Sequence, residues 1–313
     1  MTAMATTSPR GNGAFLHAAL LYRHPQQLRA AVAEFIAEAE EGAEAVLAVL
    51  PAGTLELLAD VFAGRADVEC HDVGEVGANP ARLLPWLQEW RAQRPGRVRV
   101  LNELVWPGRS YPETTECLRH EALLNYVLAA EPISMLCPYD AEHLDADVIA
   151  GAELTHPELL DDLGRRPSVV YGDPLELAAG GPWPQAEPVP PVSELGFDGD
   201  LRALRHAVAD DEVVAELDED RRQALVFAVN EAASNAVRHG DGVCDTRLWR
   251  DGDRVVSEVT TASPVADPLA GRRRPGLDAL SGRGLWLINQ VCDLVELRTG
   301  TGGASLRMHV RVA

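Results

Sequence analysis

The sequence predicts two domains in series, an α/β domain with a mostly parallel sheet followed by an α+β domain with a largely antiparallel sheet. The chain has 313 residues, which is above the usual size of a single domain. Short apolar runs alternate with helical-period stretches up to about residue 160, and the pattern then changes to helices followed by hairpins. These two observations set both the number of domains and their class.

The first domain is expected over residues 14–160, where strand-like and helix-like segments alternate. Strands are expected over 18–23, 45–51, 68–73, 98–105 and 133–140, and helices over 26–42, 53–64, 79–93 and 115–130. Strands separated by helices of this length imply βαβ units and a parallel sheet covered on both faces. Residues 161–195 are rich in Pro and Gly and lack sustained periodicity, which predicts a linker with a partly ordered first half.

The second domain is expected over residues 196–313. Its predicted elements are helices over 199–209 and 217–238, a hairpin of 244–250 and 254–261, a loop over 264–282, a helix over 284–292, and strands over 293–299 and 305–312. Asp251-Gly252 between two alternating runs is a strong hairpin signal. Helices on one face of a mixed, largely antiparallel sheet give an α+β sandwich.

Charge and composition exclude several classes of protein. The net charge is −20, which opposes direct binding to nucleic acids or anionic membranes. The sequence contains no lysine, so a P-loop lysine and a Schiff-base lysine are both excluded. No apolar run approaches the roughly 18 residues of a membrane span, and the N-terminus lacks the pattern of a signal peptide. We therefore expect a cytoplasmic protein.

The cysteines give no sign of a disulfide framework or a zinc knuckle. They stand far apart, at positions 70, 117, 137, 244 and 292, without a CxxC pair. Each is expected to pack as a small apolar residue. No HExxH spacing occurs either, so histidine and glutamate spacing does not predict a metal site.

Several short segments of the first domain carry a family resemblance. HAALLYRHPQQLRAAVAEFI, RHEALLN, LCPYD and THP together resemble the MEDS sensory domain, named for methanogens and methylotrophs, over about residues 14–160. The resemblance implies a Rossmann-like or RecA-like fold that senses a small molecule. Candidate ligand-pocket residues are His17, His24, His120 and Tyr139, with a structural role as the alternative for each. Ala18 departs from the pattern, because a glutamate is common there, and THP reads as the end of a helix before a proline.

The stretch NEAASNAVRHG, residues 230–240, carries the chemistry of the second domain. In a helix, Glu231 and Asn235 lie one turn apart on one face. An amide oxygen suits Mg²⁺, and a carboxylate can accept the proton of a hydroxyl that attacks a phosphate. Further along, Gly282-Arg283-Gly284-Leu285 opens a predicted helix, whose N-terminal N–H groups suit phosphate.

These two motifs, in this order, resemble the GHKL (Bergerat-fold, histidine kinase-like) ATPases, and in particular the anti-sigma factor serine/threonine kinases. The resemblance covers about residues 196–313 and implies ATP and Mg²⁺ as cofactors. The resemblance implies that Glu231 is the general base and that Asn235 is the Mg²⁺ ligand. The nucleotide contacts would come from His239, Gly240, Gly282, Arg283, Gly284 and Leu285.

One segment departs from this family pattern. Thr261 and Ser263 stand where an Asp and a Gly would hold the adenine, which puts both cofactors in doubt. A hydroxyl accepts a weaker hydrogen bond than a carboxylate, by about 1 to 2 kcal/mol, or about tenfold in affinity. Asp267 can replace the missing carboxylate only if the loop folds back. Gly303-Ala304-Ser305 is a milder change, since Gly-Thr is common there.

The sequence therefore favours a signalling regulator in which a ligand-sensing domain controls an anti-sigma factor-like ATPase. The partner would be a sigma factor or an antagonist protein phosphorylated on serine. Two alternatives stay open: a catalytically inactive GHKL docking module without ATP binding, and an atypical sensor histidine kinase. A homodimer also stays open.

Overall fold

The computed structural model describes residues 14–65, 67–240, 242–276 and 282–312. The chain forms two compact units. The first comprises the residues up to Asp72 with Arg91–Pro107 and Leu124–Tyr171, and the second comprises Val73–Trp90, Gly108–Leu123 and the residues from Gly172 onward. Part of the loop expected over 264–282, residues 277–281, and the last residue of the expected second domain, Ala313, lie outside the described residues.

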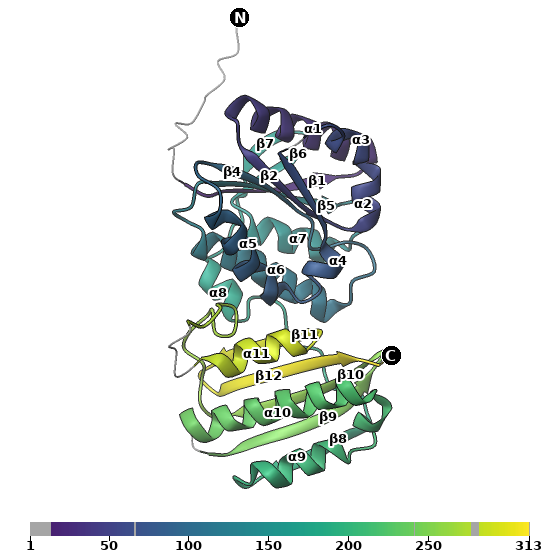
Figure 1. Cartoon of the computed structure of the whole chain (residues 1–313), viewed down its shortest axis with the longest axis vertical. Helices are drawn as coiled ribbons and strands as arrows, with labels where there is room; N and C mark the ends of the chain where they lie inside the picture. Colours follow the sequence, from purple (N-terminus) through teal and green to yellow (C-terminus); the bar gives the residue numbers. More distant parts are fainter. Residues whose placement is uncertain (1–13, 66, 241, 277–281, 313) are drawn as a thin grey trace, which may run out of the picture. The chain divides into compact units, whose positions relative to one another are not determined.

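The first unit contains a seven-stranded sheet with the order β3-β2-β4-β5-β1-β6-β7 (Figure 1). All pairings among the first six strands are parallel, which confirms the predicted parallel sheet. Strand β7 runs antiparallel to β6. Strands β6 and β7 were not expected, because their short polar sequences lack an alternating pattern. The strands are β1 (Leu16–Tyr22), β2 (Ala45–Leu50), β3 (Val68–Asp72), β4 (Val98–Asn102), β5 (Ile133–Asp140), β6 (Glu158–Asp161) and β7 (Gly164–Pro167).

Alternation along the strands gives the two faces of this sheet different roles. Helix α1 (Pro25–Gly42) packs its buried side chains, such as Leu28 and Val32, against Ala18 and Leu20 of β1. Because neighbouring side chains of a strand point to opposite faces, His17 projects to the other side of the sheet. Helix α7 (Ala146–Thr155) lies on that other side (Figure 1).

The remaining helices of the first half differ from the expected spans in two places. The helix expected over 53–64 is broken at Leu58, whose φ of −100° and ψ of 5° separate α2 (Ala52–Leu57) from α3 (Ala59–Phe62). Helix α6 begins at Tyr111 rather than at residue 115, because Glu113 accepts a hydrogen bond from the Ser110 N–H and extends the first turn. The other helices are α4 (Val73–Val76), η1 (Pro80–Arg82), α5 (Leu83–Ala92) and α6 (Tyr111–Val127).

The expected linker, residues 161–195, contains regular structure. It includes β7, helix α8 (Pro174–Ala179) and the start of strand β8 (Val192–Phe197). Asp173 caps α8 by accepting hydrogen bonds from the N–H groups of Leu175 and Glu176. Strand β8 pairs with β9, so the second sheet begins a few residues before the expected boundary at 196.

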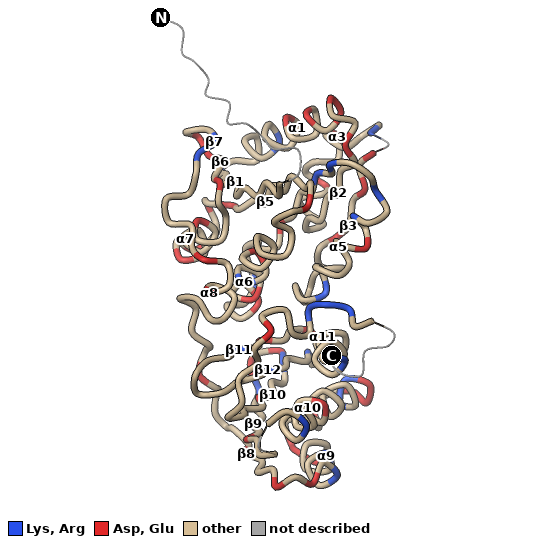
Figure 2. The backbone as a smooth tube through the Cα atoms, turned by 90° about the vertical axis from the view of Figure 1, so that its left-hand side faces the viewer, with Lys and Arg blue, Asp and Glu red and all other residues tan. Residues whose placement is uncertain are grey.

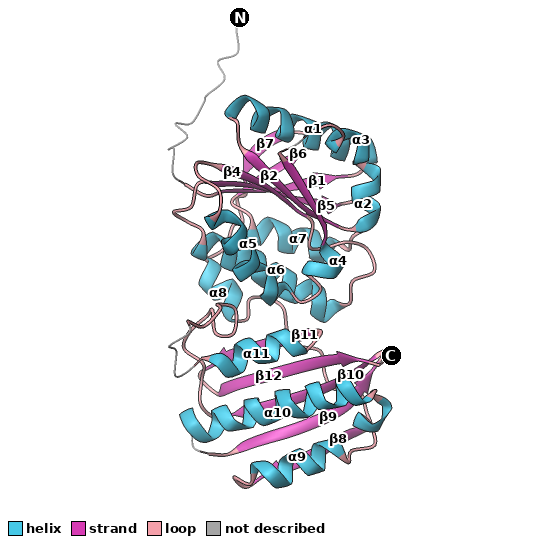
Figure 3. Cartoon of the chain, in the orientation of Figure 1, coloured by secondary structure: helices cyan, strands magenta, loops and turns pink. Residues whose placement is uncertain are grey.

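The second unit holds a five-stranded sheet with the order β11-β12-β10-β9-β8, and all of its pairings are antiparallel rather than mixed. Helices α9, α10 and α11 cover one face of it (Figure 3). Asp251 pairs with Arg254, so Gly252 and Asp253 form the hairpin turn, one residue later than expected. The elements are β9 (Cys244–Asp251), β10 (Arg254–Thr261), β11 (Leu294–Gly300), β12 (Gly303–Arg311), α9 (Leu201–Ala209), η2 (Val214–Glu216), α10 (Glu219–His239) and α11 (Arg283–Val291).

An apolar core lies between this sheet and its helices. Leu225, Val229 and Ala233 of α10 are buried against Val255 and Met308 of the sheet. This spacing of three or four residues turns the opposite edge of α10 away from the core. None of the helices in the described part of the chain is long and apolar enough to cross a membrane.

Candidate functional site

The second unit contains a cavity of about 360 Å³ between the end of α10, the segment after β10 and the first turn of α11. This volume lies within the range of small-molecule sites. Arg283 and Glu231 are not among its lining residues, although both were predicted for the site. The predicted residues that line it are Asn235, His239, Gly240, Thr261, Ser263, Gly282, Gly284 and Leu285.

The first turn of α11 lies directly against the predicted catalytic face of α10. A Cβ atom on Gly284 would lie 3.1 Å from Oε2 of Glu231 and 3.4 Å from Nδ2 of Asn235. A glycine therefore lets the α11 backbone approach these two side chains without displacing them. The structure thus brings together Glu231, Asn235 and the GRGL segment, which are about fifty residues apart in the sequence.

The start of α11 has the features of an anion site. Gly282 is its N-cap with φ of 83°, a left-handed conformation that favours glycine. The N–H groups of the following turn have no partner within the helix. Arg283 is exposed beside them, at the start of the helix labelled α11 in Figure 2. This end of the cavity is the part suited to phosphate.

The segment that departs from the family pattern lies at another wall of the cavity. The Thr261 hydroxyl donates a hydrogen bond to the Ser263 carbonyl oxygen at 3.1 Å, so only its lone pairs are left for a ligand. A Cβ atom on Gly240 would lie 3.2 Å from Oγ of Ser263, so Ser263 packs against the end of α10. Thr261 can accept a hydrogen bond there but cannot donate a second one.

Asp267 lines the same cavity, so the loop after β10 does fold back. One of its carboxylate oxygens accepts the Leu269 N–H at 2.9 Å, which fixes the turn that presents the side chain. A carboxylate is thus available at the cavity, although it comes from a position six residues after Thr261.

The four residues predicted for the sensory pocket do not come together as one group. His17 and Tyr139 are buried, and both contact the ring of His156, with ring centroids 4.1 Å and 5.6 Å away. His24 is exposed at the start of α1, where its backbone N–H donates to Gln27 Oε1. His120 is buried on α6 and does not belong to the cluster described next.

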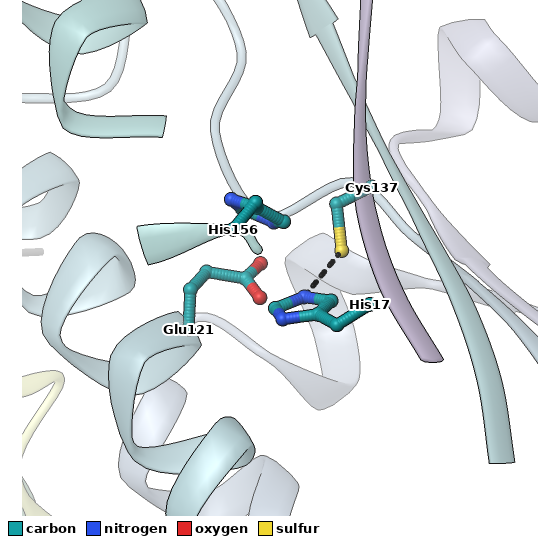
Figure 4. Close-up of side chains that lie close together, drawn as sticks. All are labelled: His17, Glu121, Cys137 and His156. Carbon is teal, nitrogen blue, oxygen red and sulfur yellow. Dashed lines mark hydrogen bonds between the residues drawn. The ribbon is translucent and has the colours of Figure 1, made fainter. Parts of the chain in front are cut away.

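A buried polar cluster lies on the face of the first sheet opposite α1. His17, Glu121, Cys137 and His156 each offer a donor atom, and these atoms lie within 4.8 Å of one another (Figure 4). His17 is 1% exposed and the other three are 0% exposed. Burial, and then the neighbouring His17, hold the pKa of His156 well below its usual range, so the imidazole is neutral near pH 7.

Three of these residues escaped the sequence-based prediction. Cys137 was expected to pack as a small apolar residue, but its Sγ lies 3.4 Å from Nε2 of His17. His156 was expected only to end a helix, and Glu121 was not singled out. Cys70, also expected to be packed, is exposed. The family resemblance was the usable signal for these three residues. RHEALLN contains Glu121, LCPYD contains Cys137 and THP contains His156, and each of these side chains can be a metal ligand.

Two family models match separate parts of the chain. The family model for the methanogen/methylotroph DcmR sensory domain (MEDS) matches residues 16–157, and the histidine kinase-like ATPase domain model matches residues 198–310. The crystal structure of the RsbU and RsbW domains of a Mycobacterium tuberculosis protein is similar over 67% of this chain and 50% of that chain, at 17% identity and a TM-score of 0.30. The match thus spans half the length of that protein chain. No curated protein matches the chain.

Proposed function

Because the chain joins a MEDS sensory domain to a histidine kinase-like ATPase domain, we propose that it is an anti-sigma factor-like signalling regulator. In this proposal a Rossmann-like sensory domain binds a small molecule and controls the action of the ATPase domain on a sigma factor or its antagonist protein. The observation that carries the proposal is the cavity of the second unit, which collects residues from NEAASNAVRHG, the segment after β10 and GRGL. The net charge of −20 favours a protein partner over a nucleic acid.

The residues around the cavity fit ATP and Mg²⁺. Asn235 would supply an amide oxygen to the metal, and the N–H groups that follow Gly282 would hold phosphate oxygens. The close approach of Gly284 to Glu231 and Asn235 supports this, because phosphate held at the start of α11 would then lie beside Asn235. At the adenine end, the Asp267 carboxylate would accept the hydrogen bond that Thr261 accepts only weakly.

ATP with Mg²⁺ supplies the phosphoryl group that a serine/threonine kinase transfers. In this chain Glu231 would accept the proton of the attacking serine hydroxyl, because its carboxylate lies beside the α11 backbone where the phosphates would be held. Arg283, exposed at the same helix start, would contribute positive charge. Mutation of Glu231 would then abolish transfer and leave binding largely intact.

Calorimetry on the full chain tests nucleotide binding. We expect submillimolar binding of ATP in the presence of Mg²⁺, and its loss in Asn235→Ala. Asn230→Ala is the matched control, because Asn230 is on the same helix but its side chain accepts a hydrogen bond from Arg205 at 2.7 Å and does not line the cavity. Equal affinities of wild type and Asn235→Ala would contradict the assignment.

A single-turnover assay with labelled ATP tests the kinase part. Candidate antagonist proteins should acquire label on serine with the wild-type chain and not with Glu231→Gln. Binding of ATP without transfer to any candidate would leave a nucleotide-dependent partner-binding domain in place of a kinase.

The alternative of an inactive docking module is favoured by one observation, the replacement of the usual Asp and Gly by Thr261 and Ser263. In that case the cavity would bind no nucleotide, and the calorimetric experiment would give no heat at millimolar ATP. An atypical sensor histidine kinase, the other alternative, would label a histidine of the chain itself.

A further inference from the structure

We propose that the buried cluster of His17, Glu121, Cys137 and His156 binds one divalent transition-metal ion, best matched by Zn²⁺. Two imidazoles, one thiolate and one carboxylate form a donor set typical of zinc and unsuited to Mg²⁺ or Ca²⁺, which require oxygen ligands. The inference concerns the sensory half of the chain and does not depend on nucleotide binding in the second unit.

The fold places these donors together from four separate elements. His17 lies on β1 and Cys137 on the adjacent strand β5, where Ala19 is paired with Cys137. Both side chains therefore project from the same face of the sheet. Glu121 comes from α6, and His156 follows the last residue of α7 (Figure 4).

The geometry is close to that of an occupied site. Zinc bond lengths of about 2.0 to 2.3 Å imply that donors in a tetrahedral site are about 3.3 to 3.8 Å apart. Nε2 of His17 and Sγ of Cys137 are already 3.4 Å apart. Since all donors lie within 4.8 Å of one another, closure around the ion requires movements of about 1 Å, which side-chain torsions can supply.

Hydrogen bonds orient both imidazoles in the manner of metal ligands. Nδ1 of His156 donates to the Ala152 carbonyl oxygen at 2.8 Å, so its Nε2 carries the lone pair. Nδ1 of His17 lies 3.0 Å from Oδ1 of Asn125, while Nδ2 of Asn125 donates to the Thr155 carbonyl oxygen at 2.7 Å. This second bond identifies the atom facing His17 as the amide oxygen, so His17 also donates from Nδ1. Histidine ligands of metals typically make such a bond through the other ring nitrogen.

Burial gives a further physical reason for a cation. A carboxylate and a thiol that are 0% exposed are stabilised strongly by a bound cation, because water is excluded from the site. No donor of the cluster is open to solvent, so the proposed ion has a structural or sensing role rather than a catalytic one.

Cobalt substitution of the full chain tests the site. Chelator-treated protein titrated with Co²⁺ should bind one equivalent and develop a thiolate-to-cobalt charge-transfer band with the visible bands of four-coordinate cobalt. Zn²⁺ should displace the cobalt and abolish these bands. Cys137→Ala should lose the charge-transfer band and weaken binding by at least about 100-fold, more than the loss of an outer hydrogen-bond partner would.

Two cysteine controls separate this site from others. Cys244→Ala removes a buried thiol from the core of the second unit, and Cys70→Ala removes an exposed thiol beside His71. Both should keep the band. A band that survives Cys137→Ala, or that disappears in Cys70→Ala, would overturn the proposal, as would the absence of any band in the wild type.

A more conservative substitution tests the site if Cys137→Ala does not fold. Glu121→Gln keeps the size of the side chain and removes its charge. It should retain the thiolate band, change the visible bands and bind Co²⁺ about tenfold or more weakly. Unchanged affinity and an unchanged spectrum would show that Glu121 is not a ligand and would overturn the four-residue site.

Discussion

The buried cluster of His17, Glu121, Cys137 and His156 and the cavity beside α10 and α11 differ in how the fold forms them. His17, Cys137 and His156 are held inside a core and have almost no exposed surface, whereas His239 and Asp267 of the cavity are exposed. The cluster depends on strand pairing and tertiary packing for its geometry. The cavity depends on helix ends and glycine backbone. Substitutions should therefore lower stability in the first region and ligand affinity in the second.

The largest expected effect comes from removing a cluster imidazole. His156→Ala deletes a ring packed against His17 and Tyr139 and removes the hydrogen bond from that ring to the Ala152 carbonyl oxygen. In metal-free protein the free energy of unfolding should fall by about 4 kcal/mol, measured by urea denaturation. His206→Ala, at an exposed position of α9, is the control and should change it by less than about 0.5 kcal/mol. Equal effects at the two positions would contradict the comparison.

A substitution at the cavity should lower ligand affinity and leave the stability of the first unit unchanged. Gly284→Val places branched atoms beside Glu231 and Asn235, since even a Cβ would lie 3.1 Å from Oε2 of Glu231. ATP affinity should fall about 100-fold, equivalent to about 2.7 kcal/mol, while the first unit unfolds as in the wild type. Gly276→Val is the matched control, because a Cβ there would meet nothing within 4 Å. Calorimetry and denaturation on the same samples measure both quantities.

The difference between the two regions also explains what the sequence could predict. Glu231 and Asn235 are one helical turn apart and GRGL is contiguous, so periodicity and helix-start chemistry were enough to identify them. The cluster joins His17 to Glu121, which is 104 residues away along the chain. A local sequence pattern does not specify which strands become neighbours in a sheet. Cys137 was therefore predicted to be an ordinary apolar residue of a strand.

The helices and strands also divide into those that local sequence patterns predict and those that depend on tertiary contacts. Strands β1 to β5 and helices α10 and α11 come from long periodic or apolar runs, and their positions were predicted within a few residues. Strand β6 is a run of four residues just before the Pro- and Gly-rich segment, and β7 and α8 lie within that segment. Tertiary pairing determines the two strands, and the Asp173 cap determines the start of α8. The return of Asp267 to the cavity depends on a turn closed by the Leu269 N–H, which the sequence alone left undecided.

Two buried carboxyl groups should make stability depend on pH in opposite directions. Burial, and secondarily Asp140, raise the pKa of Glu103 in the first unit to about 7, although a hydrogen bond from Thr54 opposes this. For Glu113 in the second unit burial acts in the same direction, but the hydrogen bond and charge of Arg254 outweigh it and lower the pKa to about 2.

The sign of each effect follows from which state binds the proton. Folded Glu103 keeps its proton between the ordinary pKa of 4.5 and about 7, so its contribution is present below 4.5 and is lost as pH rises through 7. Glu113 contributes above 4.5 and loses its contribution as pH falls toward about 2. Between pH 5.5 and 8.5, Glu103→Gln should gain on the order of 2 kcal/mol of stability relative to wild type. Urea denaturation at both pH values measures this gain, and a constant difference would contradict it.

The smallest predicted effect distinguishes two acceptors within the cavity. If Asp267 accepts the adenine amino group, Asp267→Asn should lower ATP affinity about tenfold, or about 1.4 kcal/mol. Thr261→Ala should lower it by less than about threefold, because the Thr261 hydroxyl already donates to the Ser263 carbonyl oxygen and accepts only weakly. Inosine triphosphate, which has a carbonyl oxygen in place of the amino group, should lose no affinity in Asp267→Asn, because Nδ2 of asparagine can donate a hydrogen bond to that oxygen whereas a carboxylate cannot. A larger loss in Thr261→Ala than in Asp267→Asn would instead assign the adenine contact to the hydroxyl, at the position that the family pattern gives to a carboxylate.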